Sequence, residues 1–249
     1  MTSLFLIAAC QLANSDHPAT RSMIGNPSKF IEACRKSKTA FQKIYAQKQF
    51  PTRIPNACFV FTDRAEVDIK MTLQKANKHL KPTSMFKLKC VTGETKSLLE
   101  TWKTMNRKAR QNMLYEKSAL YRCNAGLLQL SGSTGFVPNW FPVAFRECVE
   151  AGYNNAAVKM FWEMRHEADQ IENFFLEFKK QVLENGDFDL IRRILKSGYN
   201  YDSDEHYDSF INKLCNGLPQ VLLEKMRTVV PKDCVVPALE SQLMRLADE

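Results

Sequence analysis

Basic side chains recur through the middle of the N-terminal half, where their spacing would let them contact phosphate groups. Positions seven, four and three residues apart share one side of a helix, and this spacing holds for Lys96, Lys103, Arg107 and Arg110. Lys108 adds to this basic ridge, and the opposite side is apolar, formed by Leu98, Leu99, Trp102, Met105, Ala109 and Met113. Cations that displace counterions from phosphates give salt-sensitive affinity that is largely blind to sequence. The pattern predicts a polyanion contact on one helix that begins at Lys96.

A second group of lysines lies upstream, on a helix expected over residues 63–80. Lys70, Lys75 and Lys78 complete the candidate site, and nearby Lys81, Lys87 and Lys89 could add further charge. Because no aromatic residue is interleaved in the stacking pattern of single-strand readers, the ridge suits RNA phosphates and anionic lipid head groups equally. Replacing Lys103, Arg107 and Arg110 together by Ala should weaken polyanion binding and leave the fold intact, since all three are expected at the surface. Ordinary solvated lysines are the competing interpretation.

Residues that could carry catalysis or hold a metal are scattered. None of the four histidines lies near a second ligand at helical spacing, and Cys148 has no histidine partner that can be named. Neither a phosphate-binding G-x-x-x-x-G-K-[ST] loop nor a dinucleotide fingerprint occurs. The eight cysteines lack short pairing intervals, so they are expected to be reduced and mostly buried. We therefore predict no catalytic residues, no metal site and no cofactor, and hence a protein that is not an enzyme.

Charge is divided unevenly along the 249 residues. Residues 29–122 hold 21 Lys and Arg against 7 Asp and Glu, a balance of +14, whereas residues 123–249 hold 13 against 19, a balance of −6. A basic half favours phosphates or anionic lipid, and an acidic half on the same chain can pair with the basic half of a neighbour. A polyanion-binding protein that self-associates is consistent with this division.

Helical periodicity accounts for nearly every element that the pattern defines. Helices are expected over residues 1–13, 28–45, 63–80, 96–130 (an amphipathic helix followed by a buried one), 143–151, 156–185, 187–197, 203–216, 218–229 and 236–247. The apolar run 57–61 fits either a strand or a buried helix, and its helical neighbours favour a helix. Residues 82–95 resemble a linker or a short hairpin. The fold class is therefore predicted to be all-α.

Two helical regions are predicted, with a boundary near residue 152. The N-terminal helical domain, 1–152, would contain two packed bundles, about 1–81 and 96–152, with residues 82–95 as the linker between them. The C-terminal helical domain would span 153–249. With 45% hydrophobic residues the chain can bury a substantial core in each region.

Several segments together resemble the matrix proteins of orthomyxoviruses, and in particular a thogotovirus-like member distant from the influenza types. They are Phe59-Val60-Phe61-Thr62, the basic helix LLETWKTMNRKARQ, Lys117-Ser118-Ala119-Leu120 leading into an apolar helix, and the later Cys148-Val149-Glu150. The resemblance covers about residues 1–155 in order and spacing. Of the Cys/Cys/His/His cluster of the influenza members only Cys148 is in position, so zinc binding is not expected.

The resemblance implies a structural protein of the virion that polymerises as a layer beneath the envelope. Its basic helix, matched here by Lys103, Arg107, Lys108 and Arg110, would contact viral ribonucleoprotein. The implied partners are other copies of the chain, ribonucleoprotein or RNA, the inner leaflet of an anionic membrane and the tails of envelope glycoproteins. The implied locations are the virion, the host cytoplasm and nucleus, and the inner face of the plasma membrane. The alternative functions are a nucleoprotein-like RNA coat and a host helical adaptor.

Overall fold

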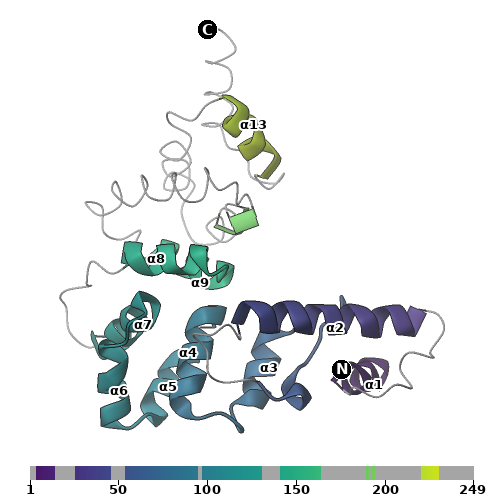
Figure 1. Cartoon of the computed structure of the whole chain (residues 1–249), viewed down its shortest axis with the longest axis horizontal. Coiled ribbons are helices and arrows are strands. Elements are labelled where there is room, and N and C mark those ends of the chain that lie inside the picture. The colour runs from purple at the N-terminus through teal and green to yellow at the C-terminus, as the bar shows by residue number, and fades with distance from the viewer. Residues whose placement is uncertain are drawn as a thin grey trace. The chain divides into compact units, whose positions relative to one another are not determined.

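The computed structural model describes residues 4–14, 26–45, 54–94, 97–130, 141–163, 189–190, 192–194 and 220–229. Helices make up 78% of this part and no strand occurs within it, which confirms the all-α class. The chain separates into two compact units, residues 1–137 and 138–249, and each is described by itself (Figure 1).

The first two helices of unit 1 pack together and confirm the expected helices over 1–13 and 28–45. Helix α1 spans Leu4–Asn14 and α2 spans Asn26–Tyr45. The buried face of α2 repeats every three or four residues, which is the period of a helix packed on one side. Its buried members are Ile31, Cys34, Lys38, Phe41 and Tyr45. Although Lys38 is buried, its Nζ donates to the carbonyl oxygen of Ala13 at 3.3 Å, so the ammonium ties α2 to the end of α1.

Residues 57–68 were expected to be mostly helical, but they contain only one short helical turn. The 3₁₀ helix η2 covers Asn56–Cys58, and an antiparallel bridge then joins Phe61 to Val67. Phe59 and Phe61 are both 1% exposed, so alternate side chains point inward, as in extended chain. Helix α3, Ile69–Ala76, begins only after Asp68, whose carboxylate accepts the backbone N–H of Met71 at 2.9 Å. The expected helix over 63–80 is therefore shorter than its pattern indicated.

The expected linker over residues 82–95 is a central helix of unit 1. Helix α4 spans Pro82–Thr92, starts with a proline in its first turn and ends at Gly93, whose φ of 72° favours glycine. It packs against α2, α3, α5 and α7, so it contacts helices that come both before and after it in the chain. Its apolar side chains are buried around most of its circumference, namely Met85, Phe86, Leu88, Cys90 and Val91.

The single helix expected from Lys96 is broken into two. Helix α5 covers Leu98–Thr104 and α6 covers Arg107–Leu114, and Met105 and Asn106 form the corner between them. Helix α7, Ala119–Leu130, packs against α6 and α4. The expectation that this helix is buried among others is confirmed by the low exposure of Ala119, Leu120, Tyr121, Cys123 and Ala125.

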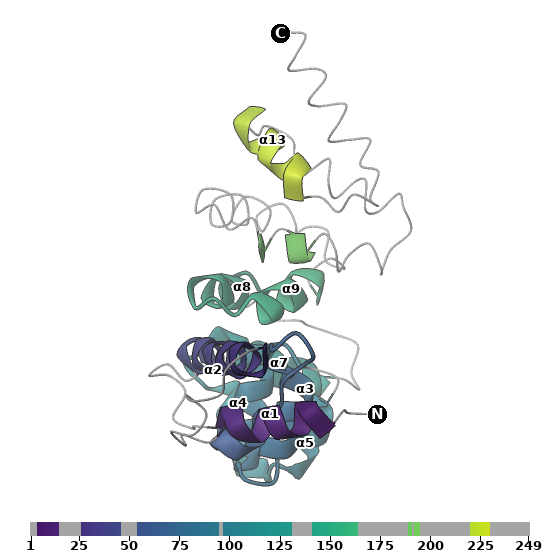
Figure 2. The same cartoon turned by 90° about the vertical axis from the view of Figure 1, so that its right-hand side faces the viewer.

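In unit 2 the described helices are α8 (Phe141–Glu150), α9 (Asn154–Glu163) and α13 (Gln220–Val229). Helices α8 and α9 lie side by side (Figures 1 and 2). The predicted boundary at residue 152 would separate these two helices, whereas the division at residues 137 and 138 keeps them together. Residues 189–190 and 192–194 are helical, as expected for 187–197. The expected helices over 203–216 and 236–247, and residues 164–185 of the helix expected over 156–185, lie outside the described residues.

Candidate polyanion-binding surface

The corner between α5 and α6 carries a cluster of exposed cations, which we call the corner cluster. It consists of Lys103, in the last turn of α5, and Arg107 and Lys108, which open α6. All three side chains are exposed. The structure therefore places three of the predicted site residues on one short stretch of surface.

The corner cluster rests on a rigid scaffold. Asn106 caps α6, because its Oδ1 accepts the backbone N–H of Ala109 at 2.8 Å. Met105 is 2% exposed and anchors the corner in the core. The chain therefore turns at a fixed point, and Arg107 follows directly from the capped residue.

Arg110 belongs to this scaffold and is not the fourth exposed cation that the sequence predicts. Its Nε donates to the carbonyl oxygen of Met105 at 2.9 Å, and its Nη2 donates to that of Lys103 at 3.3 Å. The guanidinium also lies 6.0 Å from the centre of the Trp102 ring, within the range of a cation–π contact. Its side chain is only partly exposed. Arg110 is engaged because the helix breaks at Met105. The break turns two carbonyl groups towards the guanidinium, which a continuous helix would leave in solvent.

Helix electrostatics disfavour the position of two of these cations. The N-terminus of an α-helix carries a partial positive charge, so a cation there costs stability where an acid would add about 0.3–1 kcal/mol. Helix α6 has no acidic residue in its first turn and instead begins with Arg107 and Lys108. The helix dipole, the free charges and their exposure all favour an anion at this end of α6.

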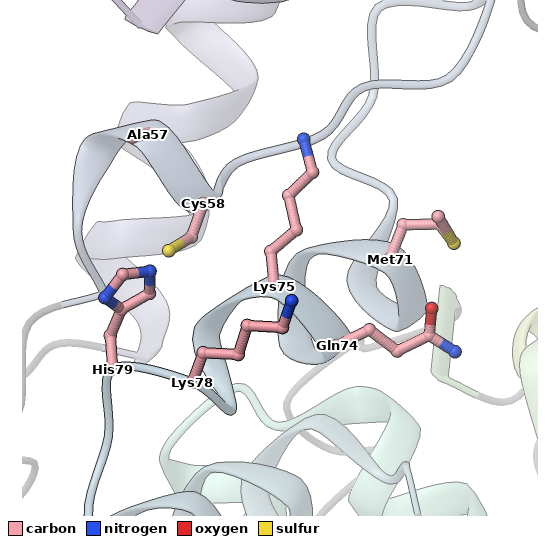
Figure 3. Close-up of a pocket in the computed structure, with 7 residues that line it drawn as sticks. All are labelled: Ala57, Cys58, Met71, Gln74, Lys75, Lys78 and His79. Carbon is pink, nitrogen blue, oxygen red and sulfur yellow. The ribbon is translucent and has the colours of Figure 1, made fainter.

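The α3 lysines form a second cluster, around an open pocket of about 410 Å³. Lys70, Lys75 and Lys78 are exposed, and the last two line the pocket together with Ala57, Cys58, Met71, Gln74 and His79 (Figure 3). Two ammonium groups and an imidazole beside a thioether and a methyl group suit an anion that carries some apolar surface.

The thiol of this pocket is poorly suited to nucleophilic chemistry. Cys58 is 2% exposed, and burial raises the pKa of its thiol, an effect that the nearby Lys75 ammonium only partly offsets. Because the thiolate is the reactive form, Cys58 is a protonated thiol at neutral pH.

The two clusters lie apart, although their residues were grouped from the sequence into one candidate site. Figure 1 shows α3 and α6 separated by α4 and α5. Lys96, which was expected to extend the ridge, lies outside the described residues.

Two upstream lysines are engaged within the fold. Lys87 Nζ pairs with Glu116 at 2.6 Å and lies 5.1 Å from the centre of the Tyr121 ring. Lys89 is 6% exposed and donates to Thr101 Oγ1 at 2.6 Å and to the carbonyl oxygen of Ser97 at 2.9 Å. These two cations are therefore committed to contacts inside unit 1, because α4 is a central helix and not a surface linker.

One surface residue was missed from the sequence. Tyr115 is 81% exposed at the C-terminal end of α6. The sequence could have indicated that Tyr115 lies on the same helix face as Lys108, because residues seven positions apart share a face.

Among the described residues, no group of three or more His, Cys, Asp or Glu side chains is arranged to hold a metal ion. Within the same part of the chain, no helix has the length and apolar character needed to cross a bilayer. Comparison of the chain with protein-family models, with curated proteins and with solved structures gave no match.

Proposed function

We propose that this chain is a viral matrix protein, a non-enzymatic structural component that assembles beneath the envelope and binds polyanions through the corner cluster. The observation that carries the proposal is the placement of Arg107 and Lys108 at the positive end of α6. Charges kept where they weaken a helix are expected at sites selected for function. A phosphate bound there would relieve the repulsion that the two cations suffer in the free protein.

Self-association is the second part of the proposal. The basic balance of +14 over residues 29–122 and the acidic balance of −6 over residues 123–249 support contacts between opposite halves of neighbouring copies. Such contacts weaken as salt screens the charges, with a Debye length of about 8 Å at physiological ionic strength. Assembly is therefore expected to be reversible by salt.

The resemblance to orthomyxovirus matrix proteins supplies the biological setting of the proposal. It supports binding to ribonucleoprotein and to the inner leaflet of an anionic membrane, in the virion and in the host cytoplasm and nucleus. The corner cluster supports the chemistry common to these partners, because RNA and acidic phospholipids both present phosphate groups.

Flotation of the full chain with vesicles of phosphatidylserine and phosphatidylcholine, compared with vesicles of phosphatidylcholine alone, tests the membrane part. We expect flotation only with the anionic vesicles and a decline as salt is raised. Sedimentation of the protein over the same salt series tests assembly. If the protein does not bind anionic vesicles but protects the whole length of an RNA from nuclease, it is an RNA coat and the proposal is wrong.

A further inference from the structure

The outer face of α6 combines cations with an exposed aromatic ring. Residues 108, 111, 112 and 115 share one side of the helix, since they are spaced three, four and seven apart. Lys108, Gln111, Asn112 and Tyr115 are all exposed, while Met113, on the opposite side, is 5% exposed. The helix therefore packs inward through Met113 and presents this polar face to solvent.

Tyr115 contributes little to the fold. Its side chain is 81% exposed, more than any other large hydrophobic residue in the part of the chain that the structure describes. Its backbone is nevertheless well fixed, because its N–H is directed at the carbonyl oxygens of Asn112 and Met113 at the end of α6. A tyrosine ring on a rigid base and in contact with water can accept a flat partner without loss of core packing.

The surroundings of the ring favour an anionic partner. The nearest acid in the sequence, Glu116, is paired with Lys87 at 2.6 Å, so its charge is neutralised within the fold. Lys108 lies two helical turns from Tyr115, a separation of about 10 Å along the axis, and Arg107 precedes Lys108. A nucleotide chain lying along α6 would place phosphates against the cations at the beginning of the helix and a base against the Tyr115 ring at its end.

We propose that the outer face of α6 binds single-stranded RNA, with Arg107 and Lys108 contacting phosphates and the Tyr115 ring stacking on a base. Cationic grooves with aromatic platforms recognise single strands in this way. The amides of Gln111 and Asn112 can bond to base edges. A paired base offers no open face, so Tyr115 adds nothing to duplex binding.

A membrane surface suits this face less well than RNA does. A helix that lies in a bilayer interface inserts an apolar side, whereas the exposed side of α6 consists of Arg107, Lys108, Gln111, Asn112 and Tyr115. Binding of this face to a lipid surface would be stabilised only by the electrostatic attraction between its cations and the anionic head groups. This inference rests on the proposed function for its polyanion and adds the form of nucleic acid and the stacking residue.

The test compares the full-length protein with its Tyr115→Leu, Tyr115→Phe and Tyr115→Trp variants. Binding is measured against a fluorescein-labelled oligouridine, a fully paired RNA duplex with the same number of phosphates, and phosphatidylserine vesicles. We expect Tyr115→Leu to lose roughly 5- to 150-fold in affinity for the single strand, as the loss of one stacked base predicts. Its salt dependence, duplex binding and vesicle binding should stay unchanged. Tyr115→Phe should bind like the parent protein.

Tyr115→Trp provides a direct signal of stacking. Its added fluorescence, relative to the parent protein, should be quenched by oligouridine and not by the duplex. Val221→Ser is the matched control, because Val221 is another exposed apolar side chain, 63% exposed on α13, and its loss should leave every affinity unchanged. Equal single-strand affinity in Tyr115→Leu and the parent protein would overturn the stacking inference and leave the proposed function standing. If the parent protein bound neither RNA nor vesicles at low salt, both would be overturned.

Discussion

The Nε of Arg110 lies 2.9 Å from the carbonyl oxygen of Met105, five residues earlier in the chain. This bond crosses the corner between α5 and α6, and a second bond from Nη2 to the carbonyl oxygen of Lys103 extends it to the end of α5. Because Lys103, Arg107 and Lys108 all lie next to this corner, one arginine fixes the helix ends that carry the corner cluster.

Replacing Arg110 by Ala should therefore destabilise the protein. Loss of two charge-assisted hydrogen bonds and of the contact with Trp102 predicts a decrease of about 1–3 kcal/mol in the free energy of unfolding. Arg110→Lys should recover only part of this, because an ammonium lacks the fork that reaches two carbonyl groups. Urea unfolding measures the effect, and exposed Arg107→Ala is the control. Equal stability of Arg110→Ala and Arg107→Ala would show that the corner does not depend on this guanidinium.

Neutralising the corner cluster should weaken polyanion binding without lowering the stability of the fold. The triple variant Lys103→Gln, Arg107→Gln and Lys108→Gln should keep the parent stability, since all three side chains are exposed. Three lost phosphate contacts predict that the slope of log affinity against log salt falls by about 2 on single-stranded RNA. The matched control is Lys29→Gln, Lys36→Gln and Lys43→Gln on the exposed side of α2, which removes the same charge elsewhere. If both triple variants changed the salt slope equally, the binding would follow net charge and not the corner.

Reversing one charge at the beginning of α6 should increase the stability of the protein while it weakens polyanion binding. Lys108→Glu exchanges a disfavoured cation for a favoured acid in the first turn, which predicts a gain of about 0.5–1 kcal/mol. Lys103→Glu makes the same change in charge in the last turn of α5, where a cation is favoured, so it should lower stability. Thermal unfolding at low ionic strength, where the dipole effect is largest, measures both. The same sign of effect for the two variants would contradict the dipole argument.

Helix α2, with its one apolar side, and the longer buried helix α7 could be predicted from the sequence, whereas the helix α4 could not. The buried face of α2 repeats regularly, whereas α4 is buried around most of its circumference and its short segment has no clear period, so it resembled a linker. The break at Met105 could not be predicted, because the apolar and basic residues keep their helical spacing across it. It is recognised in the structure by the capping of α6 by Asn106 and by the hydrogen bonds of Arg110. Whether Lys87 and Lys89 face solvent depends on partners from α5, from α7 and from the segment between α6 and α7, which no local pattern contains.

A buried ammonium links the ends of α4 and α5 and should give the stability a pH dependence. Burial lowers the pKa of Lys89 from its ordinary value of 10.5, and Glu100 and Glu94 oppose this shift only in part. Between the lowered pKa of the folded state and 10.5, the unfolded chain binds more protons than the folded chain, so the free energy of unfolding rises with pH in that window. Below the window both states are charged and this group adds no pH dependence.

Lys89→Met tests this prediction, because it keeps most of the side-chain stem and removes the charge. The carbonyl oxygen of Ser97 still accepts from the backbone N–H and the hydroxyl of Thr101, so no acceptor is stranded, and stability at neutral pH should be unchanged or higher. The stability of the parent protein minus that of Lys89→Met should rise as the pH approaches 10.5. Lys89→Ala, which also removes the buried stem, should be less stable than Lys89→Met at every pH. A flat difference between the parent protein and Lys89→Met across this range would mean that the ammonium titrates as it does in the unfolded chain.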